Sequence, residues 1–143
     1  MKKTVVWGSA VLAATLATAP VMAQTSSLLA ANLLGQEVAD GGGDDKASAN
    51  FNGEVNLTRN TLCYYLDMDG LGSANAVHIH QKDQGGTDGP SLALQVPAPN
   101  GDETCVNGDN AVLAAIAKTP DDYYIDVHTP EHPKGAVRSA LKE

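Results

Sequence analysis

The residues AVHIH at positions 76–80 and YYIDVHT at positions 123–129 alternate between apolar and polar side chains, which is the pattern of β-strands. Successive side chains of a strand point to opposite faces, so His78 and His80 share one face and the apolar residues share the other. His128 lies opposite the apolar residues of its own stretch in the same way. If both strands lie in one sheet with their apolar faces toward the core, three imidazoles share the outer face.

Three imidazoles on one face are a candidate metal site. Imidazole suits both copper and zinc, and ligands at positions i and i+2 of a strand can bind one ion. We therefore predict a copper or zinc site on His78, His80 and His128, with Asp126 and His132 as candidate further ligands or supporting groups. Two alternatives stay open. The histidines could instead fix neighbouring loops by hydrogen bonds, His128 the turn at Pro133 among them, or they could form a surface for a protein or glycan partner.

The rest of the chain continues the strand pattern. We expect strands at 27–37, 47–57, 61–68, 74–80, 92–96, 123–128 and 136–141, and one helix at 111–117. Segments rich in Gly, Pro and Asp separate them, and residues 97–107 form one such expected loop, which contains Cys105. The fold class is therefore predicted to be all-β, an antiparallel Greek-key-like β-sandwich or barrel with one short helix.

The N-terminus has the features of a secretory signal. Lys2 and Lys3 precede an apolar run, and the run ends in the small-x-Ala pattern at residues 21–23. We expect residues 1–23 to be a signal peptide and residues 24–143 to be a single domain, secreted or periplasmic. The run is too short for a comfortable membrane anchor, so no membrane span is expected after cleavage.

The charge balance limits the partners. The chain has a formal net charge of −8 at pH 7, and loss of Lys2 and Lys3 with the signal makes it more negative. Nucleic acid is an unsuitable partner, because binding it needs a basic surface. The protein or glycan partner considered above stays unidentified. Arg138, on the last expected strand, is predicted to pair with Asp126 or Glu54.

Two cysteines, Cys63 and Cys105, remain after the expected cleavage. An even number in an exported domain indicates one disulfide bond. The alternative is a Cys/His metal site, but the two cysteines are far apart and no Cys-x-x-Cys is present.

The motifs taken together resemble the CHRD domain, a module named after chordin and common in exported bacterial proteins. The resemblance runs from about residue 28 to residue 141. It rests on LLGQEV at 33–38, VHIH at 77–80 followed by GG at 85–86 and GP at 89–90, VLAAI at 112–116, YIDVHT at 124–129 and PKGAVRSAL at 133–141. Asp126 stands where the family usually has Asn, and Ser139 where it often has Gly. The resemblance implies the exported β-fold, and the two cysteines resemble those of members that carry a disulfide.

The family has no general activity to transfer. The His-x-His strand is also similar, locally, to the copper strand of Cu/Zn superoxide dismutase, but that enzyme needs more histidines than the four present here. A Ser91–His128–Asp126 triad lacks the Gly-x-Ser-x-Gly elbow of a hydrolase. We therefore expect an exported, non-catalytic protein that binds copper or zinc. The alternative is a structural or adhesive module of the cell envelope without metal, and a dismutase-like copper enzyme is the more distant alternative.

Overall fold

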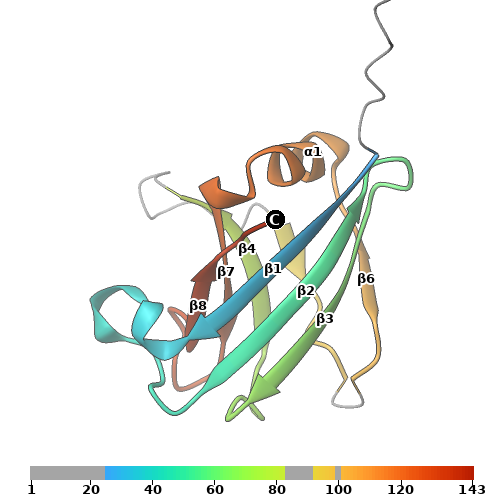
Figure 1. Ribbon diagram of the computed structural model, residues 1–143. Helices are drawn as coiled ribbons and strands as arrows, with labels where there is room; N and C mark the ends of the chain where they lie inside the picture. Colours follow the sequence, from blue (N-terminus) through green and yellow to red (C-terminus); the bar gives the residue numbers. More distant parts are fainter. Residues whose placement is uncertain (1–24, 83–91, 99–100) are drawn as a thin grey trace, which may run out of the picture.

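The computed structural model describes residues 25–82, 92–98 and 101–143. Eight strands form one sheet in the order β5-β4-β7-β8-β1-β2-β3-β6, and every pair of neighbours is antiparallel. The strands are β1 (Ser26–Leu34), β2 (Ser48–Asn56), β3 (Thr61–Asp69), β4 (Ala76–Gln81), β5 (Leu92–Leu94), β6 (Thr104–Asn107), β7 (Tyr123–His128) and β8 (Val137–Ala140). The sheet curls into a nearly closed barrel (Figure 1), so the predicted all-β antiparallel class with one short helix is confirmed.

The longest strands, β1, β2 and β3, form a meander of three nine-residue strands. Buried and exposed residues alternate along them, because one face of this part of the sheet lines the core and the other faces solvent. The turn between β2 and β3 contains Asn60 in the left-handed region at φ 54°, a conformation that Asn tolerates better than most residues. The pairing aligns Ala31 with Phe51 and Phe51 with Leu66 on the inner face.

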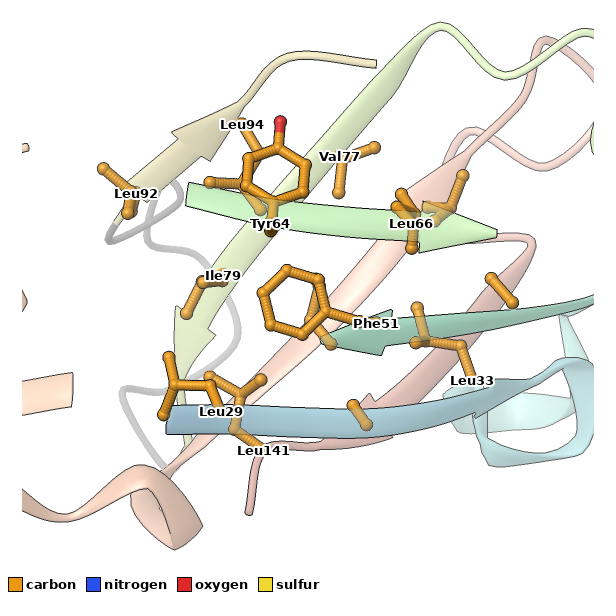
Figure 2. Close-up of a cluster of buried hydrophobic side chains, with 14 of the residues drawn as sticks. Leu29, Leu33, Phe51, Tyr64, Leu66, Val77, Ile79, Leu92, Leu94 and Leu141 are labelled. Atoms are coloured by element: carbon orange, nitrogen blue, oxygen red, sulfur yellow. The ribbon is translucent and has the colours of Figure 1, made fainter. Parts of the chain in front are cut away.

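The core lies inside the barrel. In Figure 2 the rings of Phe51 and Tyr64 lie among aliphatic side chains from β1, β4 and β5, and the two ring centroids are 5.6 Å apart. The Tyr64 hydroxyl donates to the backbone carbonyl of Gln95 at 2.5 Å, so this buried polar group has a partner. Burial raises the pKa of Tyr64 to about 12, although the bond to Gln95 opposes the shift.

Helix α1 (Asn110–Lys118) lies at one end of the barrel (Figure 1). Asp109 is its N-cap, and the Asp109 side chain accepts hydrogen bonds from the first backbone N–H groups of the helix. Leu113 and Ile116 are fully buried, so the apolar face of the helix covers the end of the core. The helix expected at residues 111–117 is thus confirmed. Three short 3-10 turns accompany these elements, at Gly35–Glu37, Ala39–Gly41 and Pro120–Asp122.

Two expectations about strands were wrong. β1 ends at Leu34 rather than at Glu37. The chain turns at Gly35, where it passes so near the backbone of Asp44 that a Cβ would collide with it. Residues 97–107 are also not a loop throughout, because Thr104–Asn107 form the edge strand β6. This strand pairs with β3 so that Cys105 lies directly opposite Cys63, and the two are joined by a disulfide. The predicted disulfide is therefore confirmed.

The expected signal peptide and the Gly-rich segment around residues 85–90 lie outside the described residues, as does Ser91. Within residues 25–82, 92–98 and 101–143, no helix is long and apolar enough to cross a membrane.

Candidate metal centre

Strands β4, β7 and β8 bring the polar residues of two distant stretches onto one patch of the outer face. In the register of these strands, His78 pairs with Asp126 and Asp126 pairs with Arg138. His128 lies opposite Ala76, one step along the same face, and His80 lies opposite Tyr124. The inward-facing neighbours, among them Val77 and Val127, are fully buried in the core. The three imidazoles therefore share one face of the sheet, as predicted.

Four side chains converge at this patch: His78, His80, Asp126 and His128. Each offers one ligand atom, and these atoms all lie within 4.8 Å of one another. His128 Nε2 is 2.8 Å from Asp126 Oδ1 and 3.2 Å from His78 Nδ1. His80 Nε2 is 3.2 Å from the same Asp126 Oδ1. In a tetrahedral zinc site with bonds of about 2.0–2.1 Å, neighbouring ligand atoms lie about 3.3 Å apart. The three contacts of 2.8–3.2 Å are close to this spacing.

Asp126 is at the centre of the group and is almost completely buried, with 1% of its side chain exposed. Its Oδ1 faces the two histidines, and its Oδ2 accepts a hydrogen bond from Arg138 Nη2 at 3.0 Å. Burial on its own raises the pKa of this carboxyl group. The hydrogen bonds from His128 and His80, together with their positive charges when protonated, outweigh burial and hold the pKa of Asp126 well below its ordinary value. Asp126 is therefore a carboxylate.

The other ring nitrogen fixes the chemistry of His128. Its Nδ1 is 3.1 Å from the Pro133 carbonyl oxygen, which can only accept, so Nδ1 carries a proton and donates. Nε2 faces the Asp126 carboxylate, so it exists in one of two forms. Either it carries a second proton, which makes the ring an imidazolium, or it presents a lone pair. A lone pair this close to the carboxylate oxygen is repelled unless a cation lies between the two atoms. The hydrogen bond to Asp126 raises the pKa of His128 more than burial lowers it, so the ring holds its second proton more tightly than a free histidine does.

His78 has the opposite tendency. Burial lowers its pKa, and the neighbouring charge of His128 adds to the shift. A neutral His78 can accept, at Nδ1, part of the hydrogen bond from the protonated His128 Nε2. The same lone pair is the form that a metal ion requires.

A second set of contacts holds the first in place. The ring of Tyr124 stacks on His80 at 4.9 Å between centroids with an interplanar angle of 15°, and the Arg138 guanidinium carbon lies 4.4 Å from the Tyr124 centroid. Arg138 Nη2 also donates to the Lys134 carbonyl at 3.4 Å. Fixed ring orientation and a hydrogen bond from the second nitrogen to a carbonyl are the usual supports of a ligating histidine.

The donor set selects among cations. Three imidazole nitrogens and one carboxylate oxygen suit Zn²⁺ and Cu²⁺. Ca²⁺ needs six or more oxygen ligands and Mg²⁺ an octahedron of oxygens, which these four atoms do not supply. The negative charge of Asp126 is also shared with Arg138, which disfavours hard cations further.

Several predicted residues lie elsewhere. His132 is outside the group of four, and its Nδ1 is 2.8 Å from the Gly42 carbonyl oxygen. Arg138 pairs with Asp126 rather than with Glu54. Cys63, Glu103 and Cys105 form a second group of close ligand atoms, but both sulfurs are in the disulfide and offer no thiolate. The stacking of Tyr124 between His80 and Arg138 was not predicted, although Tyr124 is two residues before Asp126 and shares its face.

The fold and the patch define a class of protein: a small, disulfide-linked antiparallel β-barrel that carries a His₃Asp cluster on its outer face. The model of the CHRD domain matches residues 29–141, and the chain therefore belongs to the CHRD domain family. Comparison with the curated proteins and with the solved structures gave no match.

Proposed function

We propose that this protein is an exported, non-catalytic CHRD domain that binds one zinc or copper ion through His78, His80, Asp126 and His128. The observation that carries the proposal is the convergence of four ligand atoms within 4.8 Å on a preformed, supported patch. Because Asp126 is buried and the histidines are only 14–16% exposed at His128 and His80, the site is shielded from bulk water and its ligands are held before an ion arrives. Preorganised ligands lose little conformational entropy on binding.

The metal takes the place of a proton in this scheme. Nδ1–H of His128 stays with the Pro133 carbonyl, and the Nε2 lone pair becomes a ligand when the second proton leaves. Binding therefore releases protons, and affinity falls as the pH drops.

The specific alternative is a structural role without metal. The His128–Pro133 bond, which fixes the turn after β7, is the contact that a purely structural His128 would make. The same contact is also the outer support of a metal ligand. The two roles therefore differ in whether an ion binds, and not in this contact.

The test is titration of the oxidised, chelator-stripped protein with Zn²⁺ and Cu²⁺, with the bound metal counted by mass spectrometry. We expect one ion per chain, and we expect His78→Ala and His128→Ala each to lose it. The matched control is His132→Ala, which removes a histidine outside the group and leaves binding unchanged. Equal retention in all three variants, or no ion in the wild type, supports the structural alternative instead.

We also propose that residues 1–23 are a signal peptide that is removed before residues 24–143 fold outside the cytoplasm. The Cys63–Cys105 disulfide supports this, because such bonds persist in oxidising compartments. Intact-mass measurement and N-terminal sequencing of the protein recovered from the cell envelope and the medium test it. A chain that starts at Gln24 is expected, and a chain that keeps Met1 contradicts the proposal.

A further inference from the structure

The outer face of β1, β2 and β3 is a second surface, formed by strands other than those of the metal centre and independent of the proposed function. These three strands lie side by side across the front of Figure 1, and α1 lies at the end of the barrel rather than over them. In register they form cross-strand rows on the outer face. The three central rows are Asn32–Asn50–Asp67, Ala30–Asn52–Tyr65 and Leu28–Glu54–Cys63.

The asparagines of this face are not explained by the fold. Asn is depleted in strands because its side chain competes for backbone hydrogen bonds. Yet Asn32, Asn50 and Asn52 are all exposed at strand positions, and Asn32 lies directly opposite Asn50. Within the described part of the chain, no side-chain hydrogen bond satisfies any of the three amides. These three asparagines lower the strand propensity of β1 and β2, and their amides make no hydrogen bond within the described residues. The amides are therefore available to a ligand.

Tyr65 is the aromatic group of the same face. Its side chain is 49% exposed, whereas Tyr64, its neighbour in the chain, is fully buried. Tyr65 lies directly opposite Asn52 across the β2–β3 pair, so a ring and an amide are adjacent on the surface. An exposed tyrosine offers an apolar ring face together with a polar hydroxyl.

The chemistry of the group points to sugar hydroxyls. A side-chain amide both donates and accepts, so it can bind two neighbouring hydroxyl groups, and a carboxylate accepts from a third. A tyrosine ring can pack against the C–H face of a pyranose. Glu54 and Asp67 flank the amides, and the whole chain carries a net charge of −8, which repels nucleic acids, sulfated glycans and polyuronates.

We propose that this face, defined by Asn32, Asn50, Asn52, Tyr65 and Asp67, binds a neutral polysaccharide. The ligand is a chain of equatorially substituted pyranoses, such as β-1,4-linked glucose or N-acetylglucosamine. Tyr65 stacks on one sugar ring, and the amides of Asn50 and Asn52 bind the hydroxyls of the same or the next ring. Attachment to such a polymer would leave the metal centre, which lies on other strands, free of the contact.

The experiment uses the full mature protein with cellohexaose and chitohexaose in calorimetric titrations, and with insoluble cellulose and chitin in sedimentation assays. Tyr65→Ala is expected to weaken binding about tenfold, which corresponds to about 1.4 kcal/mol. Tyr65→Phe is expected to keep most of the affinity, because it keeps the stacking ring. Asn52→Ala is expected to weaken binding as well. Lys118→Ala, an exposed change on α1, is the matched control and is expected to leave binding unchanged.

The outcomes separate cleanly. Asn52 and Tyr65 are at exposed positions, so the variants are expected to stay folded, and circular dichroism with thermal melting checks this. Loss of binding in a variant that is folded at the assay temperature is then loss of contact. Absence of binding to all four neutral glycans overturns the proposal. Binding that Tyr65→Ala and Asn52→Ala leave intact also overturns it, because the sugar then lies on another surface. Metal loading does not enter either result, so this test and the metal titration fail independently.

Discussion

Asp126 Oδ1 lies 2.8 Å from His128 Nε2, and the two side chains come from the same face of one strand, two residues apart. The contact joins a carboxylate that is 1% exposed to a ring that is 14% exposed. The apolar neighbours Ile125 and Val127 point into the core, so the pair cannot turn away from the outer face without unpacking β7.

Removing the carboxylate should destabilise the protein in the absence of metal. Asp126→Ala leaves Arg138 Nη2 and His128 Nε2 without their buried acceptor. Loss of one member of a buried ion pair costs about 3 kcal/mol. Urea unfolding in a chelating buffer measures the effect. Asp121→Ala, an exposed acid, is the control and should shift the free energy of unfolding by less than about 0.5 kcal/mol. Equal effects of the two substitutions would show that the Asp126 cluster is not stabilising.

The pair also predicts a pH dependence. The hydrogen bond to Asp126 raises the pKa of His128 above the ordinary 6.5, so NMR titration of the metal-free wild type should place it there. In Asp126→Asn the pKa of His128 should fall. A pKa that is the same in both proteins would contradict the assignment of Asp126 as its partner.

The same pKa shifts fix the pH range in which the pair stabilises the metal-free protein. The raised pKa of His128 gives stability that is complete below pH 6.5 and is lost as the pH rises through the folded-state pKa. The lowered pKa of Asp126 gives stability that is complete above its ordinary value of 3.8 and is lost as the pH falls through the folded-state pKa. Both contributions are therefore complete between pH 3.8 and 6.5. His78 opposes this on the acidic side, because its lowered pKa gives stability that is complete above 6.5 and is lost as the pH falls.

The disulfide should hold the edge strand β6 in place. Cys63 and Cys105 are separated by 42 positions, and closing a loop of this length stabilises a fold by about 4 kcal/mol on loop-entropy arguments. Among the strands that the structure describes, β6 pairs with β3 alone, so no second neighbouring strand of this set holds it. In the double variant Cys63→Ser/Cys105→Ser, hydrogen exchange at residues 104–107 should become faster, with a smaller change in β7. Unchanged exchange in β6 would show that the hydrogen bonds to β3 hold this strand in place without the disulfide.

The faces of β4 and β7 follow from the sequence alone. Alternation is sufficient to place the two histidines of β4 on one face of that strand, and Asp126 and His128 on one face of β7, because a period of two is a property of the strand itself. Which strands pair, and in which register, depends on tertiary contacts, so the 2.8–3.2 Å convergence could not be derived. For the same reason the sequence left Asp126 and Glu54 as candidate partners of Arg138, and only the fold identifies Asp126 as the partner.

The missed strand has a similar cause. β6 is only four residues long and follows a Pro- and Gly-containing segment, so its local pattern is that of a loop. Its pairing with β3 and the disulfide, both non-local, make it a strand. The helix was predictable because its signals are local: Asp109 as cap, and Leu113 and Ile116 at helical spacing.

Gly135 lies against Asp126 and Arg138, at the edge of the candidate metal centre. Its φ of +116° is a conformation that residues with a Cβ rarely adopt, and a Cβ built there would lie 3.7 Å from both Asp126 Oδ2 and Arg138 Nη2. Those distances are ordinary contacts, so the cost of Gly135→Ala comes from the backbone and should be about 2 kcal/mol. The chain between His128 and β8 must then shift, and with it the Pro133 carbonyl that orients His128. Gly135→Ala should therefore lower both the melting temperature and the metal affinity. Gly72→Ala, in open space and without a positive φ, should change neither. If Gly135→Ala lowered stability and left metal affinity intact, the orientation of His128 would not depend on this turn.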